Sequence, residues 1–247
     1  MNRLASALAL VGLAVATACA LTALGAGLGH RFGWWGYRVG IAAISRVFWV
    51  AAGAAVVCVL AVGPAAASAK GRRAFAMALA GLAIAGVTAW VPYSLRMTAR
   101  ALPPIHDITT DLADPPQFIR VATLRKPGDH PVAYEGPKVA ALQRQGYPDL
   151  APLLFKAPRE KVFAAAQAAL ASMGLEVTDA DAAQGRIEAT ATSLLFGFKD
   201  DVVVRVAADA QGTKVDVRSQ SRVGRSDFGV NAKRVRAFLA KLKASVA

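Results

Sequence analysis

The first hundred residues of this chain contain no aspartate and no glutamate. They hold nine of the 29 basic residues, whereas all 16 acidic residues of the 247-residue chain follow them. The net charge of +13 therefore belongs mainly to the N-terminal part, where the basic residues flank apolar stretches. Such placement is typical of membrane loops and argues against a nucleic-acid-binding protein. We expect membrane lipid as a partner and no nucleic acid.

Cysteine is scarce as well. The two cysteines, Cys19 and Cys58, both lie inside apolar runs. This excludes a disulfide framework or a thiolate metal site in the polar part. Motifs of the GxSxG, HExxH and glycine-rich phosphate-loop kinds are also missing, and the histidines of the polar part, His106 and His130, lie far in sequence from its serines. We expect no cofactor and do not favour an enzyme.

What the chain has in abundance is long apolar runs. Three of them, Leu4–Leu28, Val47–Ala69 and Ala74–Val91, reach or approach the ~20 residues needed to cross a bilayer. They are rich in alanine and glycine, which lets membrane helices approach closely. The first is too long for the core of a typical signal peptide. Aromatic residues near the predicted ends suit the membrane interface, namely Trp34, Trp35, Tyr37, Trp49, Trp90 and Tyr93. The sequence predicts a transmembrane region over residues 1–100.

The orientation of these helices depends on few charges. The basic residues divide four against five between the two ends of the predicted bundle. The tightest cluster is Lys70-Gly71-Arg72-Arg73, which the positive-inside rule places in the cytoplasm. Three crossings then place the C-terminal part on the outer side of the membrane.

A proline-rich connector is predicted to follow over residues 101–155. Proline stiffens the segment ALPPIHDITTDLADPPQF, Ala101–Phe118, and a short helix is expected near Lys138–Gln145. The connector holds four candidate metal ligands, but aspartates beside prolines more often form turns, and no second ligand cluster with fixed spacing exists. We therefore predict no metal. The four residues are His106, Asp107, Asp111 and Asp114.

Residues 156–247 read as a compact α+β domain. A helix is predicted over 158–173, with Pro158 suited to its first turn, and a second helix at the C-terminus. Strand-like runs with a period of two lie between them at Leu175–Thr178, Gly185–Ser193, Asp201–Ala207 and Thr213–Ser219. We predict a small antiparallel sheet with helices packed on one face.

The stretch between the last strand and the last helix, DVRSQSRVGRSDFGVNAKRV, carries the candidate site. Ser226 and Asp227 are natural helix N-caps, and the arginines around them could clamp an anion at the helix N-terminus. The predicted anion-binding residues are Arg218, Ser219, Arg222, Arg225, Ser226, Asp227, Asn231 and Arg234.

A structural role for the arginines is the alternative. Asp200 and Asp201 begin the strand expected beside Arg218, so that carboxylates and guanidinium groups could pair across strands. Two adjacent aspartates in a strand point to opposite faces, which argues against shared acid–base chemistry.

The two blocks LLFGFKDDVVVRV and DVRSQSRVGRSDFGVNAKRV resemble the signatures of the domain of unknown function 1499 family, and PPIHDITTDLADPPQF resembles the opening block of its membrane-fused members. The resemblance covers roughly residues 101–247. The family is bacterial with plastid relatives, and many short members resemble secreted lipoproteins, which implies the bacterial inner membrane and a periplasmic C-terminal domain here. Short members often carry a Cys-containing Pro-Asn-Cys-Val block, which this chain lacks. No activity is established for the family.

These observations favour a membrane-anchored envelope protein whose polar domain binds a protein, an anionic lipid or a glycan without catalysis. A hydrolase with a site near Asp200, Arg218 and Arg222 is one alternative, and an accessory subunit of a membrane transporter is another. The predicted spans hold no charge in their cores, which lowers the case for a transport pathway. The oligomeric state stays open.

Overall fold

The computed structural model describes residues 2–246, which form two compact units. The first unit comprises the chain up to Thr98 together with Leu194–Gly197. The second comprises Ala99–Ser193 and the chain from Phe198 onward. Each unit is described by itself below.

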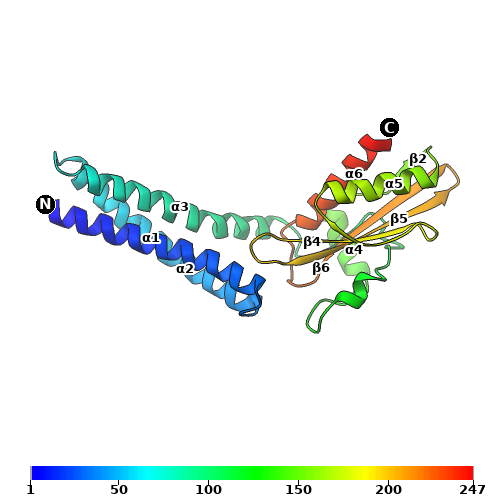
Figure 1. The fold of residues 1–247 in the computed structure, drawn as a ribbon, viewed down its shortest axis with the longest axis horizontal. Helices are drawn as coiled ribbons and strands as arrows, with labels where there is room; N and C mark the ends of the chain where they lie inside the picture. The colour runs from blue at the N-terminus through cyan, green and yellow to red at the C-terminus, as the bar shows by residue number, and fades with distance from the viewer. Residues whose placement is uncertain (1, 247) are drawn as a thin grey trace. The chain divides into compact units, whose positions relative to one another are not determined.

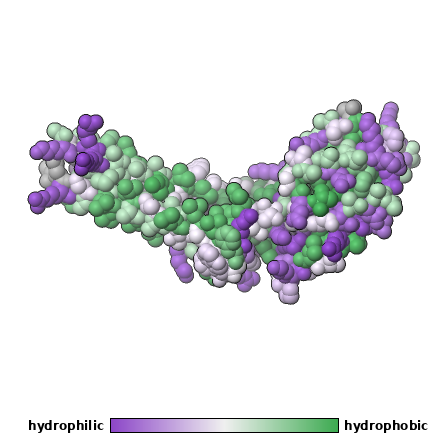
Figure 2. Space-filling view, viewed as in Figure 1, coloured by the Kyte–Doolittle hydropathy of each residue, from purple (hydrophilic) through white to green (hydrophobic). Residues whose placement is uncertain are grey.

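The first unit consists of three long helices, α1 (Asn2–Arg31), α2 (Tyr37–Ala66) and α3 (Arg72–Ala101). Each is long and apolar enough to cross a membrane. Apolar residues form most of the surface along these helices, and hydrophilic residues gather where α1 begins (Figures 1 and 2). The three predicted apolar helices are confirmed, and the chain has the features of a membrane-anchored protein.

Small residues allow these helices to pack closely. A Cβ atom at Gly12 of α1 would lie 2.5 Å from the Cys58 sulfur, and one at Gly81 of α3 would lie 2.7 Å from the same sulfur. Buried alanines such as Ala9 and Ala78 continue the contact along the helices. The alanine and glycine content noted in the sequence therefore has a packing role, because side-chain volume sets how near two membrane helices can come.

The second unit is an α+β domain. Its regular elements are β1 (Asp107–Thr109), η1 (Val121–Leu124), α4 (Pro137–Gly146), β2 (Leu153–Phe155), α5 (Arg159–Ser172), β3 (Glu176–Asp181), β4 (Arg186–Thr192), β5 (Lys199–Asp209), β6 (Gly212–Ser221) and α6 (Val230–Val246). The strands form an open antiparallel sheet in the order β1-β6-β5-β4-β3, and β2 also pairs with β6. The predicted α+β class, the four strands and the two flanking helices are confirmed.

Residues 101–155, expected as a connector, supply two further strands. β1 pairs Asp107 with Gln220, and β2 pairs Leu153 with Val215, so both extend along β6. These strands are three residues long, which is too short for a period of two to be visible in the sequence. β6, the last of the four strands predicted from the sequence, is therefore an inner strand of the sheet, between β1 and β5.

The two faces of the sheet are covered by different layers. α5 and α6 pack an apolar core against one face, where Val204, Val217 and Phe238 are fully buried or nearly so. The segment from Asp111 to Glu135 covers the other face, where Phe118 and Val121 pack on Val203 of β5 (Figure 1). Burial of both faces makes alternate residues of β6 equally inaccessible, so its polar side chains must find partners inside the domain.

Candidate functional site

The alternation of β6 divides the predicted anion site between two faces of the sheet. Arg218, Gln220 and then Arg222 have partners on the face covered by the Asp111–Glu135 segment. Ser219 and Ser221 have partners on α6, which covers the opposite face. The structure therefore separates residues that the sequence places within five positions of one another.

Arg218 is completely buried and pairs with Asp107 of β1. Its Nε and Nη2 atoms donate to the two carboxylate oxygens of Asp107 at 2.9 and 2.7 Å. Gln220 donates a third hydrogen bond to the same carboxylate at 3.1 Å. A cross-strand pair with a carboxylate was expected for Arg218, but the structure corrects its partner from the aspartates of β5 to Asp107, because β1 occupies the outer side of β6.

The remaining donors of Arg218 are also satisfied within the domain. Nη1 donates to the Pro116 carbonyl at 3.2 Å, and Nη2 donates to the Val132 carbonyl at 2.8 Å. The guanidinium lies 4.8 Å from the ring centroid of Phe118 and 5.5 Å from that of Tyr134, both within range of cation–π attraction. Arg218 thus fastens the covering segment to the sheet and has its charge neutralised in place.

A second buried cluster forms around Asp201 of β5. Arg222 donates to its carboxylate through Nε and Nη2, at 2.8 Å for the shortest contact, and Arg125 donates through Nε at 3.1 Å. The Thr190 hydroxyl donates to the same group at 2.9 Å. Burial lowers the pKa of Arg125, and the charge of Asp201 opposes this effect. Two guanidinium groups on one buried carboxylate join the sheet to the end of η1.

The opposite face holds a network centred on Asn231 of α6. The Ser219 hydroxyl donates to its Oδ1 at 2.6 Å, and its Nδ2 donates to the Ser221 hydroxyl at 2.9 Å and to the His106 carbonyl at 3.0 Å. Arg234 donates to the Ser219 hydroxyl and, at 2.7 Å, to Asp200. Asp200 and Asp201 accordingly take partners on opposite faces of the sheet.

The N-terminus of α6 is capped from within the chain. Asp227 accepts the backbone N–H groups of Gly229 at 2.9 Å and Asn231 at 2.6 Å, while the Ser226 hydroxyl accepts that of Phe228 at 3.3 Å. Burial raises the pKa of Asp227, and the two backbone donors act against that rise. The free amides that could attract an external anion at this helix are therefore occupied in part by Asp227.

Arg225 has a different environment from the other three arginines of the predicted site. Arg225 is exposed in the turn between β6 and α6, and Phe228 and Val230, three and five positions further along the chain, are 39% and 45% exposed. Phe228 has a backbone φ of +54°, a value that non-glycine residues adopt at a cost. Arg225, Phe228 and Val230 together are called the turn surface below.

The two histidines of the domain stack on each other. The ring centroids of His106 and His130 are 3.9 Å apart, with an interplanar angle of 21°. Nε2 of His106 lies 3.3 Å from a carboxylate oxygen of Glu135, and the His130 ring lies 3.0 Å from the Gly224 carbonyl. Burial lowers the pKa of His106, and His130 lowers it further, against the opposing charge of Glu135. The neutral form of His106 is the one that the fold favours.

The aspartates considered as metal ligands bind basic side chains instead. Asp111 and Asp114 contact Arg205, at 3.3 and 2.7 Å, and Asp111 also contacts Lys214 at 2.9 Å. Across residues 2–246, no group of three or more histidine, cysteine or acidic side chains is arranged to hold a metal ion.

Sequence reasoning missed three polar residues that organise the domain. Glu188 of β4 is fully buried and accepts three backbone N–H groups at the start of η1, at 2.8 to 3.0 Å. Gln143 of α4 bonds both backbone groups of Thr109 and so continues the pairing of β1. Arg125 completes the Asp201 cluster. Glu188 alternates with the apolar Ile187 and Ala189, so the sequence pattern places it on the polar face of the strand and gives no signal of its burial. Gln143 and Arg125 carry no signal either.

No curated protein matches this chain. The family described as "Protein of unknown function (DUF1499)" matches residues 107–242, which include all six strands and most of α6. The three apolar helices lie outside the matched region. Since the match covers more than half of the residues, the chain belongs to the DUF1499 family.

Proposed function

We propose that this chain is a multi-pass protein of the bacterial inner membrane whose C-terminal domain lies in the periplasm and binds an acidic partner protein through the turn surface. The domain acts as a binding module without catalysis. The observation that carries the proposal is the contrast among the arginines of the signature segment: Arg218, Arg222 and Arg234 are paired with carboxylates, whereas Arg225 is exposed.

The composition of the turn surface favours a protein partner. Arginine and aromatic residues are enriched at the energetic centres of protein interfaces. A glycan carboxylate or a lipid phosphate would pair with Arg225, but it would leave Phe228 and Val230 without a use. The positive φ of Phe228 supports the same view, because strained backbone persists where a side chain must be presented in one direction.

The non-catalytic role is supported by the state of the hydroxyl groups. Ser219 and Ser221 both bond Asn231, and His130 contacts a backbone carbonyl instead of a serine. The pairing of nucleophile and base that serine hydrolases require has no counterpart in these contacts.

Cross-linking in living cells tests the binding role. A photoreactive residue replaces Phe228 in the full chain, and a second variant carries it at Lys241, an exposed position of α6. We expect a discrete adduct from position 228 that disappears when Arg225→Glu is added. No adduct at 228, or equal adducts at both positions, would contradict the proposal.

Topology is tested separately with reporters fused after Ala247. A phosphatase that is active only outside the cytoplasm should give signal, and a fluorescent protein that matures only inside should stay dark. The reverse pattern would place the turn surface in the cytoplasm and remove the periplasmic part of the proposal.

A further inference from the structure

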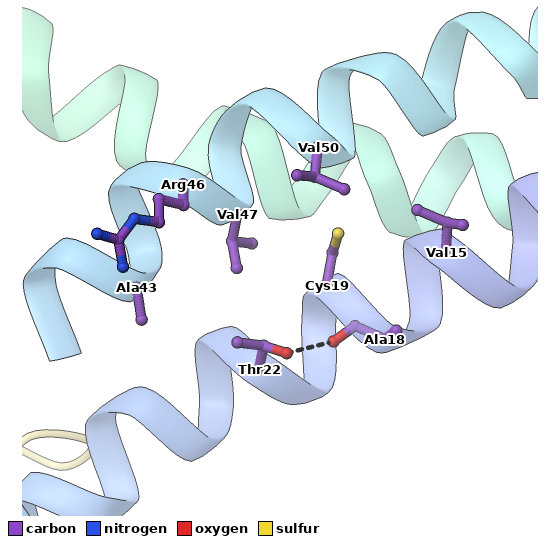
Figure 3. Close-up of a pocket in the computed structure, with 8 residues that line it drawn as sticks. All are labelled: Val15, Ala18, Cys19, Thr22, Ala43, Arg46, Val47 and Val50. Atoms are coloured by element: carbon purple, nitrogen blue, oxygen red, sulfur yellow. Dashed lines mark hydrogen bonds between the residues drawn. The ribbon is translucent and has the colours of Figure 1, made fainter. Parts of the chain in front are cut away.

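A groove lies between α1 and α2 in the three-helix unit and has a volume of about 400 Å³, within the ~300–1,000 Å³ of sites that hold small molecules. Figure 3 shows that its side chains come from facing stretches of the two helices. The lining is apolar apart from one hydroxyl and one guanidinium. The residues that matter here are Val15, Cys19 and Thr22 of α1, and Arg46, Val47 and Val50 of α2.

Arg46 directly precedes the apolar run of α2, at the end of that run where bilayer headgroups are expected. From Val47 to Ala66, α2 offers the ~20 residues, about 30 Å of helix, that cross the hydrocarbon core. On α1, the apolar run is longer and extends from Leu4 to Leu28. In Figure 3 the guanidinium points along α2 toward the N-terminal end of that helix, away from the apolar run. Long basic side chains orient in this way to reach the membrane interface.

The unit that contains Arg46 cannot neutralise it. Neither the first hundred residues nor Leu194–Gly197 include an aspartate or a glutamate. In the second unit, by contrast, most buried guanidinium groups lie against carboxylates. The anion that pairs with Arg46 must therefore come from the surroundings of the unit. A bilayer has phosphate groups at the ends of its hydrocarbon core, where the apolar run of α2 also ends.

The rest of the groove suits the acyl chain that a phospholipid carries together with its phosphate. Val15 and the nearly buried Cys19 and Val47 line the groove together with Arg46. The Thr22 hydroxyl donates its proton to the Ala18 carbonyl at 2.8 Å. The hydroxyl is thus satisfied within α1 and leaves the groove floor compatible with hydrocarbon.

We propose that this groove binds one anionic phospholipid of the surrounding bilayer, with the phosphate at Arg46 and an acyl chain along Val15, Cys19 and Val47. The inference rests on the membrane anchoring in the proposed function and adds a lipid site to it. Arginine suits this task because its planar fork donates two parallel hydrogen bonds to a phosphate.

Native mass spectrometry of the full chain in detergent, titrated with phosphatidylglycerol, tests the site. Arg46→Ala should weaken binding of the first lipid by about tenfold, the effect of losing one charge-assisted contact. Arg38→Ala is the matched control, since Arg38 is an exposed arginine of the same helix outside the groove. It should bind within about twofold of the parent. Ala43→Phe, which fills the groove and keeps Arg46, should also weaken binding.

Two further arms identify the ligand. Inorganic phosphate at the same concentration should fail to displace the lipid, because it lacks the chain. Equal losses in the Arg46 and Arg38 variants, unchanged binding in Arg46→Ala or Ala43→Phe, or displacement by phosphate would each overturn the lipid site. Alkaline extraction of membranes gives an independent readout: release of the parent chain would refute membrane anchoring itself, whereas retention with an unaltered Arg46→Ala titration would refute only the lipid site.

Discussion

Replacement of Arg218 by methionine offers the most direct test of the ion pairs inside the sheet domain. The substitution removes two hydrogen bonds to Asp107, at 2.9 and 2.7 Å, and leaves that fully buried carboxylate with Gln220 as its remaining side-chain donor. It also removes the donors to the Pro116 and Val132 carbonyls. Breaking a buried pair by removing one partner costs about 3–5 kcal/mol of unfolding free energy, a large part of the ~5–15 kcal/mol of a typical domain.

The assay must report on the sheet domain alone. All four tryptophans lie within the first hundred residues, so their fluorescence follows the helices. Pulse proteolysis of the full chain in detergent across a urea series reads the domain directly, and the expected loss corresponds to a midpoint lower by about 2 M. Arg225→Met is the matched control, because Arg225 is exposed; its free energy of unfolding should stay within about 0.5 kcal/mol of that of the parent chain.

A double variant separates two effects of Arg218→Met, namely the unpaired charge left on Asp107 and the loss of packing by the arginine side chain. Asp107→Asn combined with Arg218→Met removes both charges, so it should be more stable than the sum of the two single changes implies. A shift of less than about 1 kcal/mol in Arg218→Met, or an equal shift in Arg225→Met, would refute the assignment of Arg218 to a structural ion pair.

Three more outcomes follow from the structure. Glu188→Gln places an amide where a carboxylate accepts three backbone N–H groups, and it should lower the free energy of unfolding by about 1–3 kcal/mol in the same urea assay. Glu160→Gln, at an exposed position, should be near neutral. Equal effects of the two changes would count against the role of Glu188 at the start of η1. Gly81→Ala places a Cβ atom 2.9 Å from an α-carbon of α1 and should lower the resistance of the helices to denaturing detergent, measured by tryptophan fluorescence. Gly86→Ala, where the added Cβ atom meets open space, should leave that resistance unchanged. Similar unfolding curves for the two variants would contradict the close packing at Gly81. The pKa of His106 is lowered in the fold, so the unfolded chain binds its proton first and the stability of the domain should fall as pH drops below about 6.5. A His106→Gln variant should lose that part of the pH dependence. A pH profile equal to that of the parent chain would exclude His106 as its source.

Much of the architecture was accessible from the residues alone. The three helices follow from apolar length and the absence of acidic residues, which are local properties of composition. The four longer strands and both flanking helices follow from periodicity, as does the opposite orientation of Asp200 and Asp201. The signature blocks identified the family for the same reason: they are contiguous in sequence.

The candidate site was only partly predictable. The sequence grouped Arg218, Arg222, Arg225 and Arg234 by proximity along the chain and noted that carboxylates could pair with them. It could not assign Asp107 to Arg218 or Arg125 to Asp201, since these partners lie 111 and 76 positions apart. Which arginine stays exposed depends on those assignments.

The sequence by itself determined the elements of this protein, because helix and strand periods, apolar length and turn residues act over a few positions. Only the tertiary structure decided the use of its charges. Residues 101–155 fold back as β1, β2 and the layer over the second face of the sheet, and this layer buries Arg218 and Arg222 beside carboxylates. An ion pair forms only where two distant segments meet in a low-dielectric interior, and that meeting is a property of the whole fold.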